Sequence, residues 1–176
     1  MPGNRRKKGK TFLIRFYAIA LLVVVFDQLT KYAALAALSE GQSIPVIAGV
    51  FHFTLVHNTG IAFGLFQGYQ LPLLVIITLS IGLLIAFSSG ASDGRAGARW
   101  SLALVLGGAV GNWIDRLRHE AVIDFLDFRI WPVFNLADCA ITVGVGLYIL
   151  LFFLEKSKTS PDAFSKDNDR GNSAHS

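Results

Sequence analysis

Four long apolar runs alternate with more polar segments along this chain of 176 residues. A helix rises about 1.5 Å per residue, so roughly 20 apolar residues cross a hydrocarbon core of about 30 Å. The pattern predicts four membrane-spanning helices, over residues 12–38, 72–87, 100–117 and 135–154. Aromatic and β-branched residues between Val50 and His57, and alternation over Val122–Ile130, predict short strands within the segments 39–71 and 118–134.

The first apolar run contains Asp27 and Lys31, which are spaced four residues apart on one helix face. A cleaved signal peptide is the alternative interpretation, because the run follows basic residues and contains the small-x-small pattern Ala34-Leu35-Ala36. The run is too long for the apolar centre of a signal peptide, and charged residues are unusual there. We therefore interpret it as a retained helix in which Asp27 and Lys31 form an ion pair.

The third apolar run ends in a polar group of residues. Gly107 and Gly111 form a small-xxx-small pair, which allows another helix to approach closely. Asn112, Asp115 and Arg116 follow at i, i+3 and i+4, so their side chains point in roughly one direction. Because polar groups at membrane depth are costly, this end of the helix is a candidate functional site.

The fourth run begins with Asn135 and Asp138, which share one helix face. Their spacing is that of a helix cap with its capping-box partner, which is the simplest structural interpretation. Residues 155–176 are polar, with four acidic and four basic side chains, so we predict a disordered tail. Ile61–Phe66 is apolar but too short to span, and we predict that this segment lies on the membrane interface.

The composition indicates a membrane protein, because 53% of the residues are hydrophobic, 16% are charged and the mean hydropathy is +0.52. Cys139 is the one cysteine, which excludes an internal disulfide framework and a multi-cysteine metal site. The net charge of +4 arises mainly near the N-terminus, where six basic residues precede the first acidic residue. Beside an apolar run, such a segment favours a helix end held in the cytoplasm over nucleic-acid binding.

A cytoplasmic N-terminus sets the predicted topology of a single four-helix membrane domain over residues 12–154. Residues 1–11 form a basic cytoplasmic tail, 39–71 and 118–134 are outer loops, and 155–176 lie in the cytoplasm again. The polar residues of the spans then lie at one depth, near the outer leaflet. A proton- or cation-coupled carrier is the alternative function, but its relay needs polar groups across the whole membrane, and the inner halves of the spans nearly lack them.

The aspartates of this region suggest a hydrolase. Two carboxylates in a partly dry site do not easily both ionise, so one keeps a proton while the other acts as a base. Such a pair can activate water, direct it at an amide carbonyl and protonate the leaving nitrogen, with no metal or protein nucleophile. A Ser–His–Asp site is less favoured, because no serine lies in this cluster. The spacing leaves the pair open among Asp115, Asp124, Asp127 and Asp138.

Five sequence blocks resemble the bacterial lipoprotein signal peptidases, also called type II signal peptidases. They are FDQLTK at 26–31, HNTGIAFG at 57–64, GNWIDR at 111–116, VIDF at 122–125 and FNLAD at 134–138. The resemblance runs from about residue 12 to 154, and the blocks occur in the family's order. Each block alone is a weak signal, whereas the five together are specific.

The resemblance implies a four-helix membrane protein with a small extracytoplasmic β-cradle and a short interfacial helix. It also implies an aspartic endopeptidase of the bacterial inner membrane, which cleaves a prolipoprotein just before its diacylglyceryl-modified cysteine. Carried onto this chain, the catalytic pair is Asp124 and Asp138. The other matching positions are the site-lining residues Asn58, Asn112, Arg116 and Asn135 and the supporting polar residues Asp27, Lys31 and Asp115.

The expected partners are the lipidated prolipoprotein substrate and membrane lipid, without nucleic acid, metal or cofactor, and we expect a monomer. We also expect the apolar faces of Ile61–Phe66 and Phe125–Phe134 to clamp the lipidated segment over the catalytic pair. In one respect this chain departs from the family pattern. Only 13 residues, 125–137, separate the two aspartates, a short connection that implies a trimmed outer loop.

Overall fold

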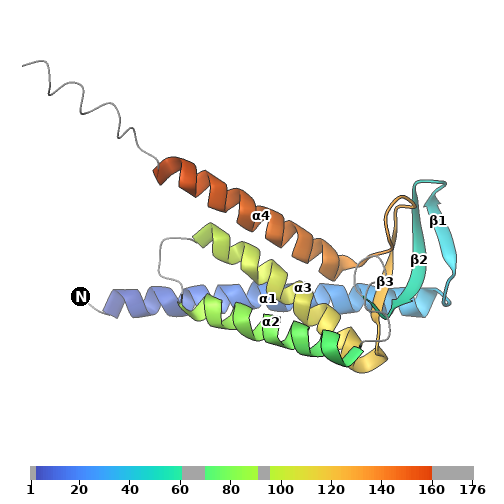
Figure 1. Cartoon of the computed structure of the whole chain (residues 1–176), viewed down its shortest axis with the longest axis horizontal. Helices are drawn as coiled ribbons and strands as arrows, with labels where there is room; N and C mark the ends of the chain where they lie inside the picture. Colours follow the sequence, from blue (N-terminus) through green and yellow to red (C-terminus); the bar gives the residue numbers. More distant parts are fainter. Residues whose placement is uncertain (1–2, 61–69, 91–95, 160–176) are drawn as a thin grey trace, which may run out of the picture.

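The computed structural model describes residues 3–60, 70–90 and 96–159. Within these residues, four helices and three strands follow one another along the chain (Figure 1). The helices are α1 (Gly3–Ala37), α2 (Gln70–Gly90), α3 (Ala96–His119) and α4 (Leu136–Thr159). The strands are β1 (Ser43–Ile47), β2 (Phe51–Asn58) and β3 (Val122–Asp127). The strands lie together at the end of the helices opposite the N-terminus (Figure 1).

The four predicted helices are present, and the first and last are longer than predicted. α1 begins at Gly3 rather than near residue 12, so most of the predicted basic tail is helical. α4 continues to Thr159, so the prediction of disorder is wrong for residues 155–159. Both extensions are rich in residues of favourable helix propensity, and a helix that has already formed propagates easily. The predicted interfacial segment Ile61–Phe66 lies outside the described residues.

Three of the described helices contain segments long and apolar enough to cross a membrane, namely Thr11–Ala37, Leu71–Ser88 and Leu136–Leu154. α3 has 24 residues and is therefore about 36 Å long, but its polar end lowers its hydropathy. A spanning role for residues 100–117 stays a prediction.

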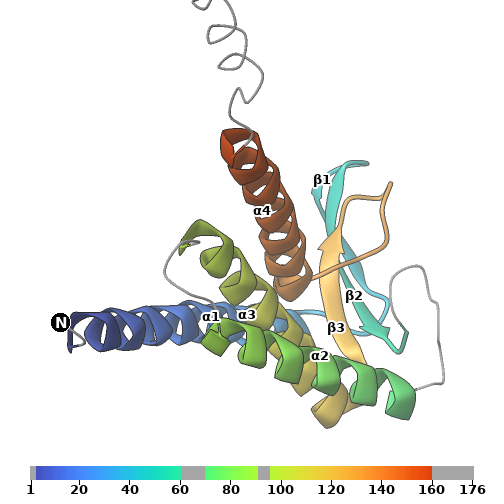
Figure 2. The ribbon, with the colours of Figure 1, turned by 60° about the vertical axis from the view of Figure 1, so that its left-hand side comes forward.

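α3 is the helix on which the others pack, since it contacts α1, α2 and α4. A Cβ on Gly107 would lie only 2.6 Å from the Cβ of Val23 in α1, so the predicted close helix approach at Gly107 is confirmed. Gly144 of α4 lies equally close to α3, where a Cβ would be 2.7 Å from the carbonyl oxygen of Ser101. α4 starts beside the sheet and diverges from α1 toward its other end (Figure 2).

The strands form one antiparallel sheet in the order β1-β2-β3. The strands predicted over Val50–His57 and within Val122–Ile130 are confirmed as β2 and β3. The sequence pattern does not predict β1, which contains Pro45. β1 is an edge strand, where a proline is tolerated although it cannot donate to a ladder. Gly49, at a φ of 73°, forms the turn into β2.

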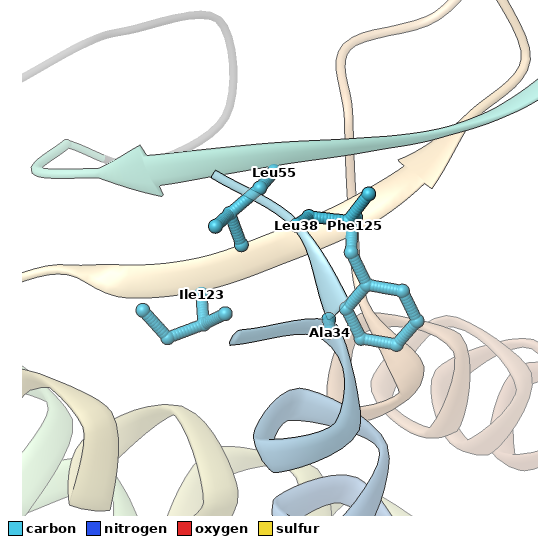
Figure 3. Packing of buried hydrophobic residues seen from close by; sticks show 5 residues of the cluster. All are labelled: Ala34, Leu38, Leu55, Ile123 and Phe125. Atoms are coloured by element: carbon cyan, nitrogen blue, oxygen red, sulfur yellow. The ribbon is translucent and has the colours of Figure 1, made fainter. Parts of the chain in front are cut away.

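One face of the sheet packs on the end of α1 (Figure 3). Leu55 of β2 and Ile123 and Phe125 of β3 form a buried cluster with Ala34 and Leu38. Burial of a leucine, isoleucine or phenylalanine side chain stabilises a fold by about 1.5–3 kcal/mol. Because Ile123 and Phe125 face this cluster, alternation along β3 directs the residue between them to the other face of the sheet.

Candidate active site

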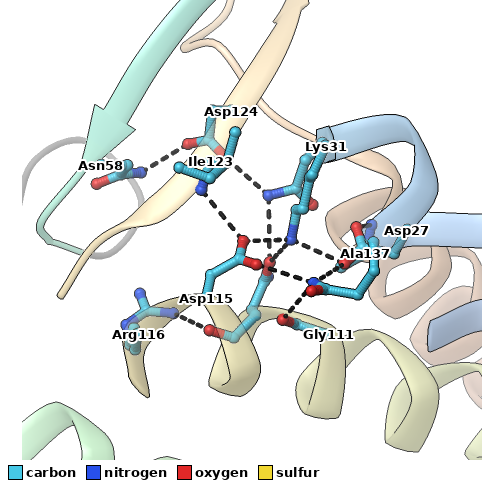
Figure 4. A network of polar contacts seen from close by, with 12 residues as sticks. Asp27, Lys31, Asn58, Gly111, Asp115, Arg116, Ile123, Asp124 and Ala137 are labelled. Atoms are coloured by element: carbon cyan, nitrogen blue, oxygen red, sulfur yellow. Dashed lines mark hydrogen bonds and ion pairs between the residues drawn. The ribbon is translucent and has the colours of Figure 1, made fainter. Parts of the chain in front are cut away.

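Polar side chains from α1, α3, α4, β2 and β3 meet where the sheet joins the ends of the helices (Figure 4). The nine residues that the resemblance singles out all lie in this region, and their roles stay predictions. They gather at one end of the helices rather than along their length, which does not suit a relay across a membrane. Five of them form two groups, which we call the charged triad (Asp27, Lys31 and Asp115) and the carboxylate pair (Asp124 and Asp138).

The charged triad is almost completely buried, with side-chain exposures of 0–3%. Lys31 Nζ lies 2.8 Å from Asp27 Oδ2 and 2.7 Å from Asp115 Oδ2. The predicted Asp27–Lys31 ion pair is therefore confirmed. Gln28 Nε2 donates a hydrogen bond of 2.8 Å to Asp115 Oδ1. The triad supplies each buried charge with partners, and without them burial would cost several kcal/mol per ion.

The triad also holds the backbone next to each member of the carboxylate pair. The N–H of Ile123 donates to Asp115 Oδ2 at 3.2 Å, and Ile123 immediately precedes Asp124. The N–H of Ala137 donates to Asp27 Oδ1 at 2.9 Å, and Ala137 immediately precedes Asp138. The two acceptors belong to one ion-paired cluster. The triad therefore ties β3 and the start of α4 to each other through α1 and α3.

The carboxylate pair receives its hydrogen bonds from asparagine amides. Asp124 accepts from Asn58 Nδ2 at 2.9 Å and from Asn135 Nδ2 at 2.6 Å. Asp138 accepts from Asn112 Nδ2 at 2.8 Å. Asn135 Oδ1 also accepts the backbone N–H of Asp138 at 2.9 Å, so the predicted helix cap is confirmed. Capping alone does not account for Asn135, because the same side chain donates to Asp124.

Lys31 fixes the orientation of the Asn112 amide. An ammonium group only donates hydrogen bonds, so the Asn112 atom that lies 2.8 Å from Lys31 Nζ is the oxygen Oδ1. The same oxygen accepts from Asn135 Nδ2 at 3.2 Å. The Nδ2 group of Asn112 must then face Asp138. One amide therefore joins the triad to the carboxylate pair.

Two aspartates of β3 have pKa values shifted in opposite directions. Burial raises the pKa of Asp124 to about 7, and the nearby Asp138 carboxylate adds to the rise against the hydrogen bonds from Asn58 and Asn135. Burial also acts to raise the pKa of Asp127, but hydrogen bonds from Thr54 and Arg129 outweigh it and hold the pKa below its usual value. Near neutral pH, Asp124 can carry a proton while Asp127 is ionised.

A cavity of about 770 Å³ adjoins the carboxylate pair. Asp124 and Asp138 both line it, whereas Asp115 belongs to the triad and Asp127 binds Thr54 and Arg129. Of the four candidate aspartates, these two therefore share one accessible space. The cavity also contains the site-lining residues Asn58, Asn112 and Arg116, and its apolar wall includes Ile77 of α2, Ala109 of α3 and Ile141 of α4.

The structure adds two residues that the resemblance does not single out, although both lie within its sequence blocks. Gln28 donates to the triad, and the Gly60 carbonyl accepts from Arg116 Nη2 at 2.8 Å. The Gly60 N–H donates to Asn58 Oδ1 at 3.0 Å, so Asn58 is a turn residue as well as a donor to Asp124. Among the described residues, no group of three or more His, Cys, Asp or Glu side chains is arranged to hold a metal ion.

Comparisons with known proteins agree with these sequence blocks. The family model described as signal peptidase (SPase) II matches residues 19–154. Similar proteins include the lipoprotein signal peptidases of Moorella thermoacetica, 51% identical over 131 residues (74% of this chain and 87% of that protein), and of Brevibacillus brevis, 45% identical over 148 residues (81% and 97%).

A similar solved structure is that of a bacterial membrane enzyme, determined by the in meso method at 2.3 Å resolution. Its TM-score is 0.77 at 32% sequence identity, and the match covers 82% of this chain and 91% of that one. A second such structure, at 1.9 Å resolution, has a TM-score of 0.71 at the same identity and covers 78% and 92%. The residues matched by the family model include both members of the carboxylate pair.

Proposed function

Since the chain belongs to the signal peptidase II family, we propose that it cleaves diacylglyceryl-modified prolipoproteins by an aspartate mechanism. Members of this family are bacterial inner-membrane peptidases that remove signal peptides from prolipoproteins. In this proposal Asp124 and Asp138 are the catalytic residues, and the scissile bond lies on the N-terminal side of the lipidated cysteine. The mechanism uses no metal or cofactor.

One observation carries the proposal, namely that Asp124 and Asp138 line one cavity and are held there by neutral amides. Amide donors orient a carboxylate without neutralising it, so the pair can exchange protons with water and substrate. With a pKa of about 7, Asp124 is suited to hold the shared proton at neutral pH. Asp138 is then the ionised partner and acts as the base.

The reaction follows from these protonation states. Asp138 takes a proton from a water molecule, whose oxygen attacks the scissile carbonyl carbon while Asp124 gives its proton to the carbonyl oxygen. In the tetrahedral diol that forms, Asp138 passes its proton to the leaving nitrogen and the C–N bond breaks. Asp124 recovers its proton from a hydroxyl of the diol. Both carboxyl groups return to their starting states, and one water has been consumed.

The cavity wall suits a lipidated, apolar substrate. Ile77, Ala109 and Ile141 face the cavity from α2, α3 and α4, and can contact the apolar signal segment. Polar groups lie at the sheet end, where Asn58 and Arg116 line the cavity and can bind the peptide backbone beside the scissile bond. The substrate therefore meets an apolar wall along the helices and a polar one at the carboxylate pair.

The membrane placement is part of the same proposal. Four spans, including α3, carry the polar end of the helices to the outer leaflet, and both termini lie in the cytoplasm. The sheet then forms an extracytoplasmic cradle at the membrane surface. Water reaches the carboxylate pair from outside, while the lipidated substrate reaches it from the bilayer. We expect the monomer to be active.

A gel-shift cleavage assay tests this function with purified protein and a diacylglyceryl-modified prolipoprotein. We expect wild-type cleavage, and a loss of roughly 10²–10⁴-fold in rate for Asp124→Asn and for Asp138→Asn, because each removes one proton-transfer group. Both amides are nearly isosteric with the acid they replace, so the fold should be retained.

Glu120→Gln is the matched control, because Glu120 is an exposed acid immediately after α3. This variant should cleave at the wild-type rate. Full activity in either Asp124→Asn or Asp138→Asn would exclude this pair, and no cleavage of the lipidated substrate by the wild type would contradict the proposed function.

A further inference from the structure

Asp127, the last residue of β3, is a buried acid that the proposed reaction does not use. It is 3% exposed and does not line the cavity. Its Oδ2 accepts hydrogen bonds from Thr54 Oγ1 at 2.7 Å and from Arg129 Nη1 at 2.9 Å, and its Oδ1 accepts the backbone N–H of Arg129 at 2.8 Å. Three donors thus converge on one carboxylate, two of them from a single residue of the following loop.

Arg129 has a backbone conformation that needs support. Its φ is 64°, in the left-handed region that is unfavourable for a residue with a side chain. The bond from the Arg129 N–H to the carboxylate of Asp127, two residues earlier, is that of an Asx turn. Asp127 therefore stabilises the turn through both the backbone and the side chain of Arg129.

This turn starts the segment 128–134, which forms part of the cavity wall. Trp131, Pro132, Val133 and Phe134 all line the cavity beside the carboxylate pair. The segment closes at its base, where Phe134 and Leu126 exchange backbone hydrogen bonds of 3.0 and 2.8 Å. The Phe128 ring stacks on that of Phe134, with ring centroids 5.9 Å apart. The direction taken at Arg129 therefore determines where these residues lie.

Asp127 is itself secured to the sheet. Thr54, which donates to it, also bonds Ser43 of β1, with the two hydroxyl oxygens 2.8 Å apart. Ser43 Oγ in turn lies 3.0 Å from His52 Nδ1. These contacts link the carboxylate, which lies on β3, to β2 directly and to β1 through Thr54. Because its pKa is held below the usual value, Asp127 stays ionised at neutral pH and keeps all three acceptor contacts.

We propose that Asp127 is a positioning residue, which holds the segment 128–134 over the carboxylate pair so that this segment forms a wall of the substrate site. The proposal rests on the proposed function. It accounts for a buried acid beside the reacting pair that does not itself reach the cavity. It also explains how a connection of only 13 residues, 125–137, is kept in one conformation between the two aspartates.

The kinetic test compares three variants on a lipidated prolipoprotein. Asp127→Ala removes all three acceptor contacts, so KM should rise roughly tenfold, the effect of losing about one charged hydrogen bond, with a smaller change in kcat. Asp127→Asn keeps an acceptor for the Arg129 N–H and should stay within about threefold of the wild type, since Asn also forms Asx turns. Arg129→Gly in the Asp127→Ala background should lower KM most of the way back to the wild-type value, because glycine adopts a positive φ without support.

Hydrogen exchange provides a readout that does not depend on cleavage. In the Asp127→Ala variant, the backbone amides of residues 128–134, and that of Phe134 in particular, should exchange faster than in the wild type. The amides of α3 should stay protected. Substrate affinity is a second readout that does not need cleavage, and it can be measured with the Asp138→Asn variant. Adding Asp127→Ala to this variant should weaken its affinity for the lipidated substrate roughly tenfold. If the wild type fails to cleave, the proposed function fails while these two measurements still test the anchoring.

The alternative is that Asp127 belongs to the reacting pair. In that case Asp127→Asn would lose activity as severely as Asp127→Ala, and the pH dependence of kcat/KM would change in both variants. That result would overturn the proposal. Unchanged exchange in 128–134, or faster exchange with unchanged KM and affinity, would overturn it as well.

Discussion

The charged triad and the carboxylate pair lie side by side and are joined by the Asn112 amide, yet their buried carboxylates have different kinds of partner. In the triad, Lys31 lies within 2.8 Å of both acids, and the backbone supplies further donors. In the pair, the donors to Asp124 and Asp138 are neutral asparagine amides. A cation opposes the protonation of a carboxylate more strongly than a neutral amide does, so the pair exchanges a proton more readily than the triad.

This difference separates acids that hold the structure together from acids that can react. The triad accepts hydrogen bonds from the backbone of Ile123 and Ala137, so it sets the positions of Asp124 and Asp138 without lining the cavity. The pair faces a cavity and can therefore meet water and substrate. Removing the cation should therefore damage the fold, whereas neutralising a member of the pair should spare it.

The largest effect is expected from Lys31→Met, which keeps the approximate length of the side chain and removes its charge. Asp27 and Asp115 would then be buried without a cation, and breaking a buried ion pair in this way costs about 3–5 kcal/mol. We expect a correspondingly lower free energy of unfolding, measured by denaturant titration of the detergent-solubilised protein. Adding Asp115→Asn should recover part of the loss, because it removes one of the two unpaired charges.

Arg118→Met is the control for this comparison, because Arg118 is an exposed cation in the last turn of α3. Exposed charges contribute about 0–1 kcal/mol, so this variant should unfold close to the wild type. Equal stability of the Lys31→Met variant and the wild type would show that the triad does not depend on its cation.

Asp124→Asn should have a smaller effect on the free energy of unfolding than Lys31→Met, and in the opposite direction. The folded-state pKa of Asp124, about 7, exceeds the ordinary aspartate value of 3.8, so wild-type stability falls as pH rises between these values. Asparagine does not titrate. The variant should therefore gain stability relative to the wild type as pH rises from about 4 to about 7, by roughly 2–4 kcal/mol in total. Thermal unfolding midpoints of both proteins across this range provide the measurement.

Asp127→Asn is the matched substitution on the same strand, and its expected effect on stability has the opposite sign. The pKa of Asp127 is held below its usual value, so its contribution is present at neutral pH and is lost as the acid protonates. This variant should be less stable than the wild type at pH 7, with a deficit that shrinks in acid. A deficit independent of pH would show that the Asp127 charge is not what stabilises the turn.

The sequence predicts most of the fold because the apolar runs and strand patterns are local signals. It does not predict β1, whose Pro45 is tolerated only because the strand lies at the sheet edge. The helical state of residues 3–11 and 155–159 is also missed, because charged composition alone does not distinguish a tail from the end of a long helix.

The sequence indicates which residues form the candidate site, but it does not indicate which of its acids can react and which hold the structure together. Sequence spacing cannot separate Asp115 from Asp124, because the cation that distinguishes them, Lys31, comes from α1 far along the chain. The resemblance chooses Asp124 and Asp138, and the geometry gives a physical reason, since these two line the cavity. Asp127 is the fourth candidate, and its partners Thr54 and Arg129 become visible only once the strands are paired.

The smallest effect concerns the amides that distinguish the pair from the triad. If protonated Asp124 is required, kcat/KM should decline as pH rises through about 7. Asn58 donates to the Asp124 carboxylate and favours its ionised form, so Asn58→Ala should move this decline upward by about one pH unit, the effect of one hydrogen bond to a charge. Thr54→Val, on the same strand, removes a donor to Asp127 instead and should leave the decline in place. A decline that does not move in Asn58→Ala would mean that another group, and not Asp124, carries the proton that the reaction needs.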